Sequence, residues 1–329
     1  MLQLTRLVFL PVFRLDLLNL LPALACPILQ KEDSAPSRKL SNSRRERALH
    51  HSGIVITLGI RIREKRKRRP SKGEGHRYSQ SPSMTSTNAS PAPLAKLVRR
   101  REVADRTVAF ELEKPPGWTF KAGQAVDVTL LEPPESDGEG NTRTLSIASA
   151  PWEGSLTVVT RMRDTAFKRV LSAMPSGAEV KVEGPFGNLI LHNNIARAAV
   201  ILAGGIGITP FRSMVFHAAQ EKLPHRIYLF YSNRRPEDAA FLEELETLEK
   251  QNQNYRFIPT MTGMEKSHRA WNGETGRIDQ RMVSRHLNDA PSPIYYIAGP
   301  AGMVKGLHAM LNESGVDDDD IRAEEFGGY

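Results

Sequence analysis

The sequence predicts an antiparallel β-barrel followed by an α/β domain with a doubly wound parallel sheet, both behind a disordered basic extension. Three observations support this prediction. From Leu94 onward, short β-type runs are separated by clusters of Gly and Pro, and after about residue 192 apolar strands alternate with helical segments. Positive charge is concentrated in the first part of the chain. We expect the extension over residues 1–90, the barrel over 91–190 and the α/β domain over 191–329.

The basic character of the chain belongs to its first part. Residues 1–83 contain 17 Lys and Arg against 6 Asp and Glu, whereas the whole chain has a net charge of +8. The folded part therefore has a slight negative balance, which gives no electrostatic reason to expect specific nucleic-acid binding. Dense basic blocks such as RIREKRKRR repel themselves and stay solvated. We favour an extension without a specific role over a tether to nucleic acid or to an anionic membrane.

The native start of the protein is open to more than one interpretation. Ala23-Leu24-Ala25 resembles a signal-peptide cleavage site, although Asp16 in the approach to it argues against one. Met84 precedes a polar stretch and is an alternative start, so residues 1–83 need not belong to the native protein. The longest uncharged run here, Leu17–Gln30, has 14 residues, fewer than the roughly 20 that a transmembrane helix needs.

Cysteine and histidine usage argues against metal and disulfide chemistry. The single cysteine, Cys26, lies in the extension. Disulfides, thiolate zinc sites and iron–sulfur clusters each need several cysteines. The nine histidines show no metal-binding spacing. We therefore expect a reduced, cytoplasmic protein without a metal site.

The expected barrel consists of short strands and one helix. Clusters such as PPGW and EPPESDGEGN mark the turns between the β-type runs, which is typical of an antiparallel barrel or sandwich. The expected strands lie within residues 95–113, 124–132, 142–149, 155–162 and 178–184, and the expected helix spans 165–174.

The expected α/β domain begins with the all-apolar run AAVILAGG at residues 198–205, which is typical of a strand buried on both faces of a parallel sheet. Further strands are expected at 225–232, 255–262, 292–299 and 321–327, with helices at 209–222, 236–251, 278–287 and 300–315. Ligands of such sheets bind at the carboxyl ends of the strands. This rule places residues 204–209, 232–235, 260–263, 299–302 and 324–329 along one rim.

The first turn of this domain has the composition of an anion site. Gly205 and Gly207, with Gly204, allow a tight turn and a close approach of the backbone to a ligand. Thr209 is expected to cap the following helix, and Pro210 suits its first turn. The free amides of that helix would bind an anion, and a dinucleotide pyrophosphate is the usual one. A turn that serves only close packing is the alternative.

Six motifs, taken in their order along the chain, indicate a resemblance to a known family. They are Arg143-Thr144-Leu145-Ser146, GPFG at 184–187, GGIGITPF at 204–211, YSNRRPEDAAF at 231–241, AGPAGMV at 298–304 and EEFGGY at 324–329. From about Leu94 to Tyr329 the sequence resembles the ferredoxin–NADP reductase superfamily of flavin reductases. The resemblance implies a flavin-binding barrel, a nicotinamide-nucleotide domain, and a flavin in the cleft between them.

The same resemblance assigns the flavin-binding residues. Arg143 would pair with a flavin phosphate, Thr144 would line the flavin, and Ser146 would lie near the flavin N5 that receives hydride. Leu145 stands where the family usually has an aromatic residue that stacks on the flavin. The helix that starts near Thr165 would present its amides to the phosphates, although Thr165 could equally act only as a cap. The SIASAP segment favours FAD over FMN.

The C-terminal residues are further candidates by the resemblance. Tyr329 would cover the flavin in place of the missing aromatic, and it would move aside for nicotinamide. Glu324, with Glu325 as the alternate, corresponds to the family's acidic residue near the flavin, although a salt bridge is an equal alternative. Phe326 belongs to the same motif.

Nicotinamide-nucleotide binding is implied at two other turns. Gly299 and Met303 match the family's last nucleotide turn, where Ala298 replaces a frequent cysteine. Ser232, Arg234 and Arg235 follow the second strand of the sheet, and no acid for a ribose 2′-hydroxyl precedes Glu237. Two arginines suit a 2′-phosphate, with Arg235 the more informative, which favours NADPH over NADH.

The expected activity is hydride transfer from NADPH to FAD, followed by electron delivery to a separate acceptor. A ferredoxin, a flavodoxin, an oxygenase component or a small molecule would fit that role. Cations near the expected flavin edge, at Arg161, Arg163, Lys168 and Arg169, could dock an acidic carrier, and an ordinary solvated surface is an equal alternative. Two alternatives stay open, a reductase of free flavin and a non-catalytic flavin-binding redox sensor. The oligomeric state is not predicted.

Overall fold

The structure is a computed structural model, and it describes residues 92–287 and 290–327. The expected basic extension, the alternative start at Met84, the Cys26 position and the candidate Tyr329 all lie outside the described residues. The described residues belong to a single compact unit.

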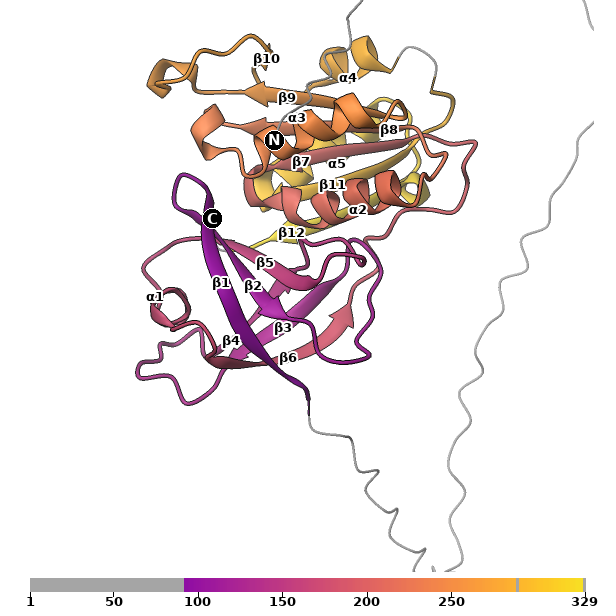
Figure 1. Cartoon of the computed structure of the whole chain (residues 1–329). Coiled ribbons are helices and arrows are strands. Elements are labelled where there is room, and N and C mark those ends of the chain that lie inside the picture. Colours follow the sequence, from indigo (N-terminus) through magenta and orange to yellow (C-terminus); the bar gives the residue numbers. More distant parts are fainter. Residues whose placement is uncertain (1–91, 288–289, 328–329) are drawn as a thin grey trace, which may run out of the picture. The chain divides into compact units, whose positions relative to one another are not determined.

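The first part of this unit is the expected antiparallel barrel (Figure 1). Its six strands pair in the order β4-β3-β6-β1-β2-β5, and a bridge between Ile147 and Val158 joins the two ends of the sheet. The elements are β1 (Leu94–Ala104), β2 (Thr107–Glu113), β3 (Ala125–Leu130), β4 (Thr142–Ser146), β5 (Ser155–Arg161), α1 (Ala166–Ala173) and β6 (Glu179–Phe186).

The barrel interior follows from the alternation of its strands. In β3, Val126, Val128 and Leu130 point inward and are buried, while the residues between them are partly exposed. Phe110 of β2 and Phe167 of α1 fill the same core. Helix α1 is therefore attached to the barrel by an apolar side chain near its N-terminus.

The second part is a six-stranded parallel sheet in the order β10-β9-β8-β7-β11-β12. Its strands are β7 (Ala199–Gly204), β8 (Ile227–Asn233), β9 (Tyr255–Met261), β10 (Glu274–Thr275), β11 (Ile294–Pro300) and β12 (Ile321–Phe326). The sequence did not indicate β10. Because all pairings are parallel, the carboxyl ends of these strands lie along one edge, as expected.

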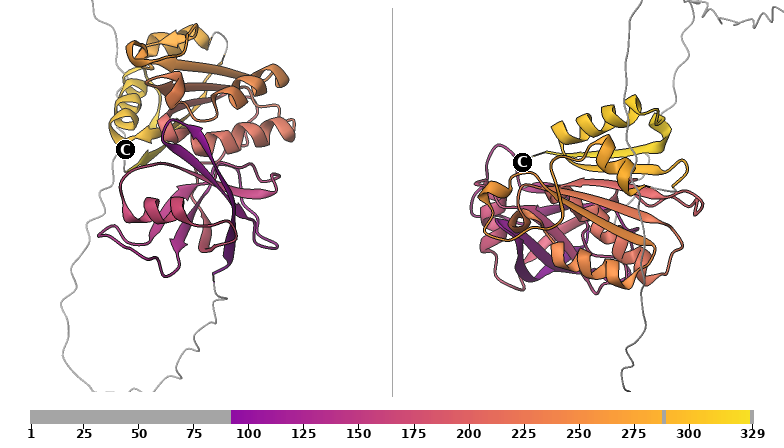
Figure 2. Two further views of the ribbon diagram at one scale, coloured as in Figure 1. Left: turned by 60° about the vertical axis from the view of Figure 1, so that its left-hand side comes forward. Right: turned by 90° about the horizontal axis from the view of Figure 1, so that it is seen from above.

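Helices cover both faces of the sheet (Figure 2). The helices are α2 (Thr209–Gln220), α3 (Leu242–Gln251), α4 (Gln280–His286) and α5 (Ala301–Glu313), with short 3-10 turns η1 (Gly205–Ile208), η2 (Pro236–Asp238), η3 (Met264–Lys266) and η4 (Asp318–Asp320). Helices α2 and α3 pack in one apolar cluster, and α4 and α5 pack in another on the opposite face. Strand β7 is buried along its whole length between them.

Two local predictions are wrong. The helix expected from residue 236 begins only at Leu242, because Phe241 adopts a left-handed conformation with φ of 62° and separates η2 from α3. Thr209 is not the cap of α2 but its first residue, and its hydroxyl donates a hydrogen bond back to the carbonyl of Ile206 (3.0 Å). The intervening turn η1 supplies the start of the helix instead.

The glycine turn after β7 is required by close backbone packing. Gly205 has φ of 51°, which favours glycine. A Cβ atom on Gly207 would lie 2.2 Å from the carbonyl oxygen of Ala298, and one on Gly204 would lie 2.2 Å from the sulfur of Met303. The turn is therefore packed directly against the end of β11. These glycines therefore serve close packing, which does not conflict with a role in anion binding.

In the part of the chain that the structure describes, no helix combines the length and the hydropathy needed to cross a lipid bilayer.

Gly207→Ala should destabilise the protein by about 1–3 kcal/mol, because the added methyl group meets rigid backbone rather than a movable side chain. The measurement is the free energy of unfolding by urea. Gly306→Ala is the matched control, since its Cβ would meet nothing within 4 Å and alanine suits a helix interior. Equal stability of the two variants would contradict the packing role of Gly207.

Candidate functional site

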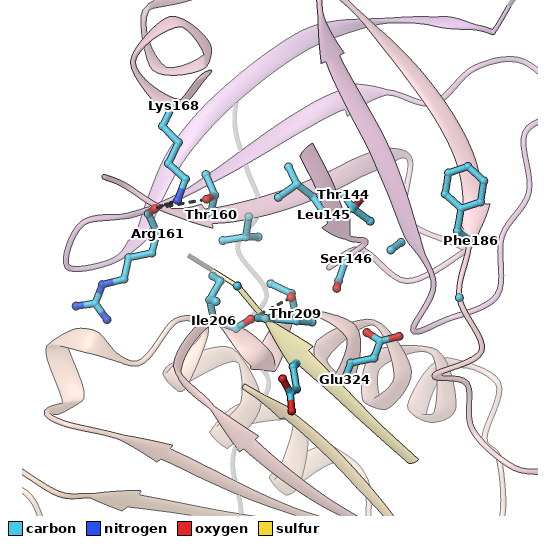
Figure 3. Close-up of a pocket in the computed structure, with 16 residues that line it drawn as sticks. Thr144, Leu145, Ser146, Thr160, Arg161, Lys168, Phe186, Ile206, Thr209 and Glu324 are labelled. Carbon is cyan, nitrogen blue, oxygen red and sulfur yellow. Dashed lines mark hydrogen bonds between the residues drawn. The ribbon is translucent and has the colours of Figure 1, made fainter. Parts of the chain in front are cut away.

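A pocket of about 450 Å³ lies where the barrel meets the rim of the sheet (Figure 3). We call it the junction pocket. Its lining comes from β3, β4, β5, β6 and α1 of the barrel, and from η1, α2 and β12 of the α/β domain. The lining residues are Ala125, Thr144, Leu145, Ser146, Val159, Thr160, Arg161, Lys168, Phe186, Gly187, Ile206, Thr209, Glu324, Glu325, Phe326 and Gly327.

Strand β4 brings the predicted motif to this pocket. Ser146 pairs with Ala125 of β3, and both line the junction pocket. Thr144 lines it too, and its hydroxyl donates a hydrogen bond to the Asp127 carboxylate. Leu145 packs on the barrel core as well as contributing to the pocket wall. On the pocket side of β4, the Thr144 hydroxyl therefore already bonds Asp127, and the Ser146 hydroxyl lies beside an aliphatic side chain.

Glu324 approaches the same pocket from β12. Its carboxyl group is partly buried, and that burial raises its pKa above the ordinary value of 4.5. Within residues 92–287 and 290–327, no hydrogen bond or ion pair engages this carboxyl group. The salt bridge considered for Glu324 is therefore not seen among these residues. In contrast, the Glu325 carboxylate lies 3.9 Å from the Lys305 ammonium group. Glu324 is the carboxylate available for chemistry in the pocket.

The rim of the sheet closes the pocket on the other side. Ile206 of η1 and Thr209 of α2 line it, and Phe326 of β12 packs against the core cluster of the α/β domain. The turn that carries the two predicted glycines therefore lies beside the strand that carries Ser146. Gly205, Gly207 and Pro210 do not line the pocket, but they shape the turn that does.

One end of the pocket is cationic. Lys168 of α1 and Arg161 of β5 lie there, and the Lys168 ammonium donates a hydrogen bond to the Arg161 carbonyl (2.7 Å) (Figure 3). Burial, with the positive charges of Arg163 and Arg143 nearby, lowers the pKa of Lys168 below its ordinary value. This end would attract an anionic group of a ligand.

Arg143 does not line the junction pocket. Its guanidinium donates hydrogen bonds to the carbonyls of Glu139, Gly140 and Thr142 and to the Glu139 carboxylate (2.7 Å). It also lies over the ring of Phe167, 4.9 Å from the centroid. Arg143, the residue predicted to bind a flavin phosphate, is therefore bound to the loop that precedes β4.

The N-terminus of α1 is capped from a distance. The Ala166 amide donates a hydrogen bond to the carboxylate of Asp137 (2.7 Å), and Thr165 at the N-cap makes no capping hydrogen bond. The Thr165 hydroxyl is buried without a hydrogen-bond partner. The helix amides that were expected to meet a phosphate are thus adjacent to a carboxylate.

A second pocket, of about 610 Å³, lies farther along the rim between the ends of β8 and β9 and helix α5. We call it the rim pocket. Ser232 and Met303, two of the residues predicted to bind nucleotide, line it, and Gly299 packs beside Gly204. Arg277, which was not predicted from the sequence, also lines it and is exposed. No motif marks Arg277, because it follows a short strand, β10, that the sequence did not indicate.

Arg235 forms ion pairs that connect the two domains. Its guanidinium bonds Asp105 of the β1–β2 turn (2.9 Å) and Asp238 of η2 (2.8 Å). The two arginines of this segment differ, because Arg234 is exposed and Arg235 is paired. Neither lines the rim pocket, so the geometry does not favour Arg235 as the residue that detects a 2′-phosphate.

Two further lining residues of the junction pocket received no role from the sequence. Phe186 ends β6 within the GPFG motif, and its side chain is 45% exposed although it is large and apolar. Thr160 lies on β5 at the cationic end. The sequence patterns at these two positions were weak predictors, because the face of the barrel on which a strand residue lies can be assigned only when the strand register is known.

The junction pocket fits the ring of a flavin. It combines apolar and aromatic walls with hydroxyl groups and with the Glu324 carboxyl group, which no described residue pairs with, and it lies between a barrel and a nucleotide-type rim. The fit is weaker for the flavin phosphates, because loop carboxylates and carbonyls already bind both Arg143 and the α1 amide.

The chain is similar in sequence to reductase components. Residues 201–309 match the family model of the oxidoreductase NAD-binding domain. The chain is 28% identical to the glycine betaine monooxygenase reductase subunit of Chromohalobacter salexigens over 226 residues, which is 68% of this chain and 60% of that protein. It is 29% identical to one subunit of the Na(+)-translocating NADH-quinone reductase of Pseudoalteromonas atlantica over 160 residues, 47% of this chain. The chain spans 39% to 60% of these two relatives.

Solved structures share the fold. The Amycolatopsis cytochrome P450 reductase GcoB matches with a TM-score of 0.60 and 19% identity, over 71% of this chain and 71% of that one. A ferredoxin NADP+ reductase from Neisseria gonorrhoeae with bound FAD and NADP matches with a TM-score of 0.58 and 22% identity, over 71% of this chain and 98% of that one. The predicted barrel and nucleotide-type sheet are therefore confirmed as a known two-domain combination.

Glu324→Gln should stabilise the protein at pH 7 and leave it unchanged at low pH. Burial raises the folded-state pKa of Glu324, so the stability associated with its protonated form is present below about pH 4.5 and is lost as the pH rises through the folded-state pKa. Glutamine avoids that loss. The measurement is the free energy of unfolding as a function of pH.

Glu325→Gln is the control for this pH series, since Glu325 is the exposed neighbour on the same strand. It should follow the wild-type curve. A Glu324→Gln curve that runs parallel to wild type at every pH would contradict the burial of an ionised carboxylate in the pocket.

Proposed function

We propose that this chain, which has the two-domain fold of the ferredoxin–NADP reductase superfamily, is an NADPH-dependent flavoprotein reductase that binds FAD and delivers electrons to a separate acceptor. The observation that carries the proposal is that β4 of the barrel and the first turn of the α/β domain line one pocket. Two ring systems bound by the two domains could meet there. We place the reductase in the cytoplasm.

FAD, when bound, would accept hydride and release electrons singly, which is the chemistry the cofactor supplies. The chain supplies position and electrostatics. Ser146 would donate or accept a hydrogen bond at the ring edge, and Phe326 with Leu145 would enclose its apolar part. Glu324 would hold or release a proton near the reacting atoms, which a raised pKa favours.

NADPH would bind along the rim, with its pyrophosphate at the η1–α2 turn and its adenosine end in the rim pocket. Arg277 is the cation that the rim pocket offers to a 2′-phosphate. The names of the relatives support an oxygenase component as the electron acceptor, since one of them is a monooxygenase reductase subunit. Arg163 remains a candidate for docking an acidic acceptor, whereas Arg169 is paired with Glu135 and Asp164.

Reduction of free flavin is a second candidate function. The observation that favours it is Leu145, whose aliphatic side chain stands in the pocket wall where the related reductases usually stack an aromatic ring. A flavin held without that stacking contact would leave the pocket more readily.

The test is anaerobic mixing of the flavin-loaded chain with NADPH and, in parallel, with NADH, while flavin absorbance is recorded. We expect bleaching by both nucleotides, and faster bleaching by NADPH at low concentration. Arg277→Ala should raise the apparent KM for NADPH about tenfold or more and leave that for NADH within about twofold, because a charge-assisted contact to phosphate is lost.

Arg281→Ala is the matched control, since Arg281 is an exposed arginine on α4 that does not line the rim pocket. It should leave both KM values unchanged. No bleaching within minutes with either nucleotide would end the reductase proposal. Bleaching with an unchanged nucleotide preference in Arg277→Ala would refute only the role of Arg277.

A further inference from the structure

We propose that the acidic loop, residues 131–141 between β3 and β4, competes with the terminal phosphate of a flavin for the N-terminal amide of α1 and for Arg143. The inference rests on the proposed function, because it takes the flavin ring to lie in the junction pocket. Three acidic side chains of this loop, those of Glu135, Asp137 and Glu139, each bind a cationic group or an amide at α1 or β4.

Asp137 occupies the position where an anion would meet α1. One carboxylate oxygen accepts the Ala166 amide (2.7 Å), and the other accepts the Glu139 amide (3.0 Å). The bond from Ala166 lowers the pKa of Asp137, so the carboxylate stays charged at neutral pH. A threonine at an N-cap usually bonds the helix amides itself. Here the Thr165 hydroxyl is buried and unpartnered among the described residues, and Asp137, 29 positions before Ala166, provides the acceptor.

Arg143 is bound by the same loop. Its guanidinium bonds two loop carbonyls, the carbonyl of Thr142 at the start of β4 and the Glu139 carboxylate, and its side chain is only 18% exposed. Arginine binds phosphate through the same planar set of donors that it uses for a carboxylate. A phosphate that took the Nη2 donor now used by Glu139 would have to displace that carboxylate.

Glu135 attaches the loop to the outer side of α1. It accepts two hydrogen bonds from Arg169 (3.0 and 2.5 Å), and both side chains are more than 40% exposed. Exposed ion pairs contribute little individually. The loop is consequently held by contacts that an incoming dianion can displace, so the relation is a competition and not a permanent block.

The acidic loop and the junction pocket share their boundary residues. Thr144, which lines the pocket, directly follows Arg143, and Lys168, at the cationic end of the pocket, lies on α1 (Figure 3). A ribityl chain that left the ring near Ser146 toward Lys168 would bring its phosphate to Asp137 and Glu139. A flavin without a phosphate avoids this exchange and leaves the loop in place.

Riboflavin and FMN differ by the terminal phosphate alone, so their affinities isolate this effect. The full chain is titrated with each flavin, and the quenching of flavin fluorescence gives the Kd. We expect wild type to bind riboflavin at least as tightly as FMN. Asp137→Asn, and the double variant Asp137→Asn/Glu139→Gln, should tighten FMN binding about tenfold and leave riboflavin binding within about twofold.

Glu113→Gln is the matched control, since it makes the same charge change at an exposed position on β2. It should leave both affinities unchanged. Wild-type FMN binding ten times tighter than riboflavin binding, or equal tightening of both flavins by the loop variants, would overturn the competition and leave the reductase proposal intact. Failure of the wild-type chain to bind either flavin would overturn both proposals. If Asp137→Asn does not fold, two measurements still test the competition. They are the FMN and riboflavin affinities of the wild-type chain and those of the Glu139→Gln single variant.

Discussion

The arrangement of the junction depends on one buried cation, Arg212 of α2. Its guanidinium lies 4.4 Å from the ring centroid of Phe216 and 4.9 Å from that of Phe241. It bonds Glu153 of the barrel (3.0 Å) and Glu244 of α3 (2.9 Å). A buried charge is costly unless it is paired, and here its partners come from both domains. The pairing therefore joins the segment between β4 and β5 to helices α2 and α3.

A second set of contacts reinforces this junction and changes the interpretation of a familiar motif. Arg235 joins Asp105 to Asp238, and the Asp105 amide donates a hydrogen bond to the carbonyl of Glu237 (2.7 Å). An arginine after the second strand of a nucleotide-binding sheet suggests recognition of a 2′-phosphate, yet this one holds the barrel against the sheet. A preference for a 2′-phosphate would then depend on another cation, and Arg277 lines the rim pocket.

The two domains and most of their elements could be predicted from the sequence, because apolar periodicity and Gly/Pro turns act locally. The pocket positions of Ser146 and Glu324 also followed from motifs. What could not be predicted depends on contacts between distant segments. Asp137 caps a helix 29 residues away, and this required knowledge of how the loop folds. The break before α3 at Phe241 likewise comes from a left-handed residue that propensity does not indicate.

The central claim is that a flavin ring binds between Ser146 of the barrel and Phe326 of the sheet. A crystal structure of the full chain with riboflavin tests it most directly. We predict ring density in the junction pocket, with Ser146 within hydrogen-bond distance of the ring edge and Glu324 facing it. Riboflavin density in the rim pocket or on the outer surface of the barrel, with the junction pocket filled only by solvent, would contradict the claim.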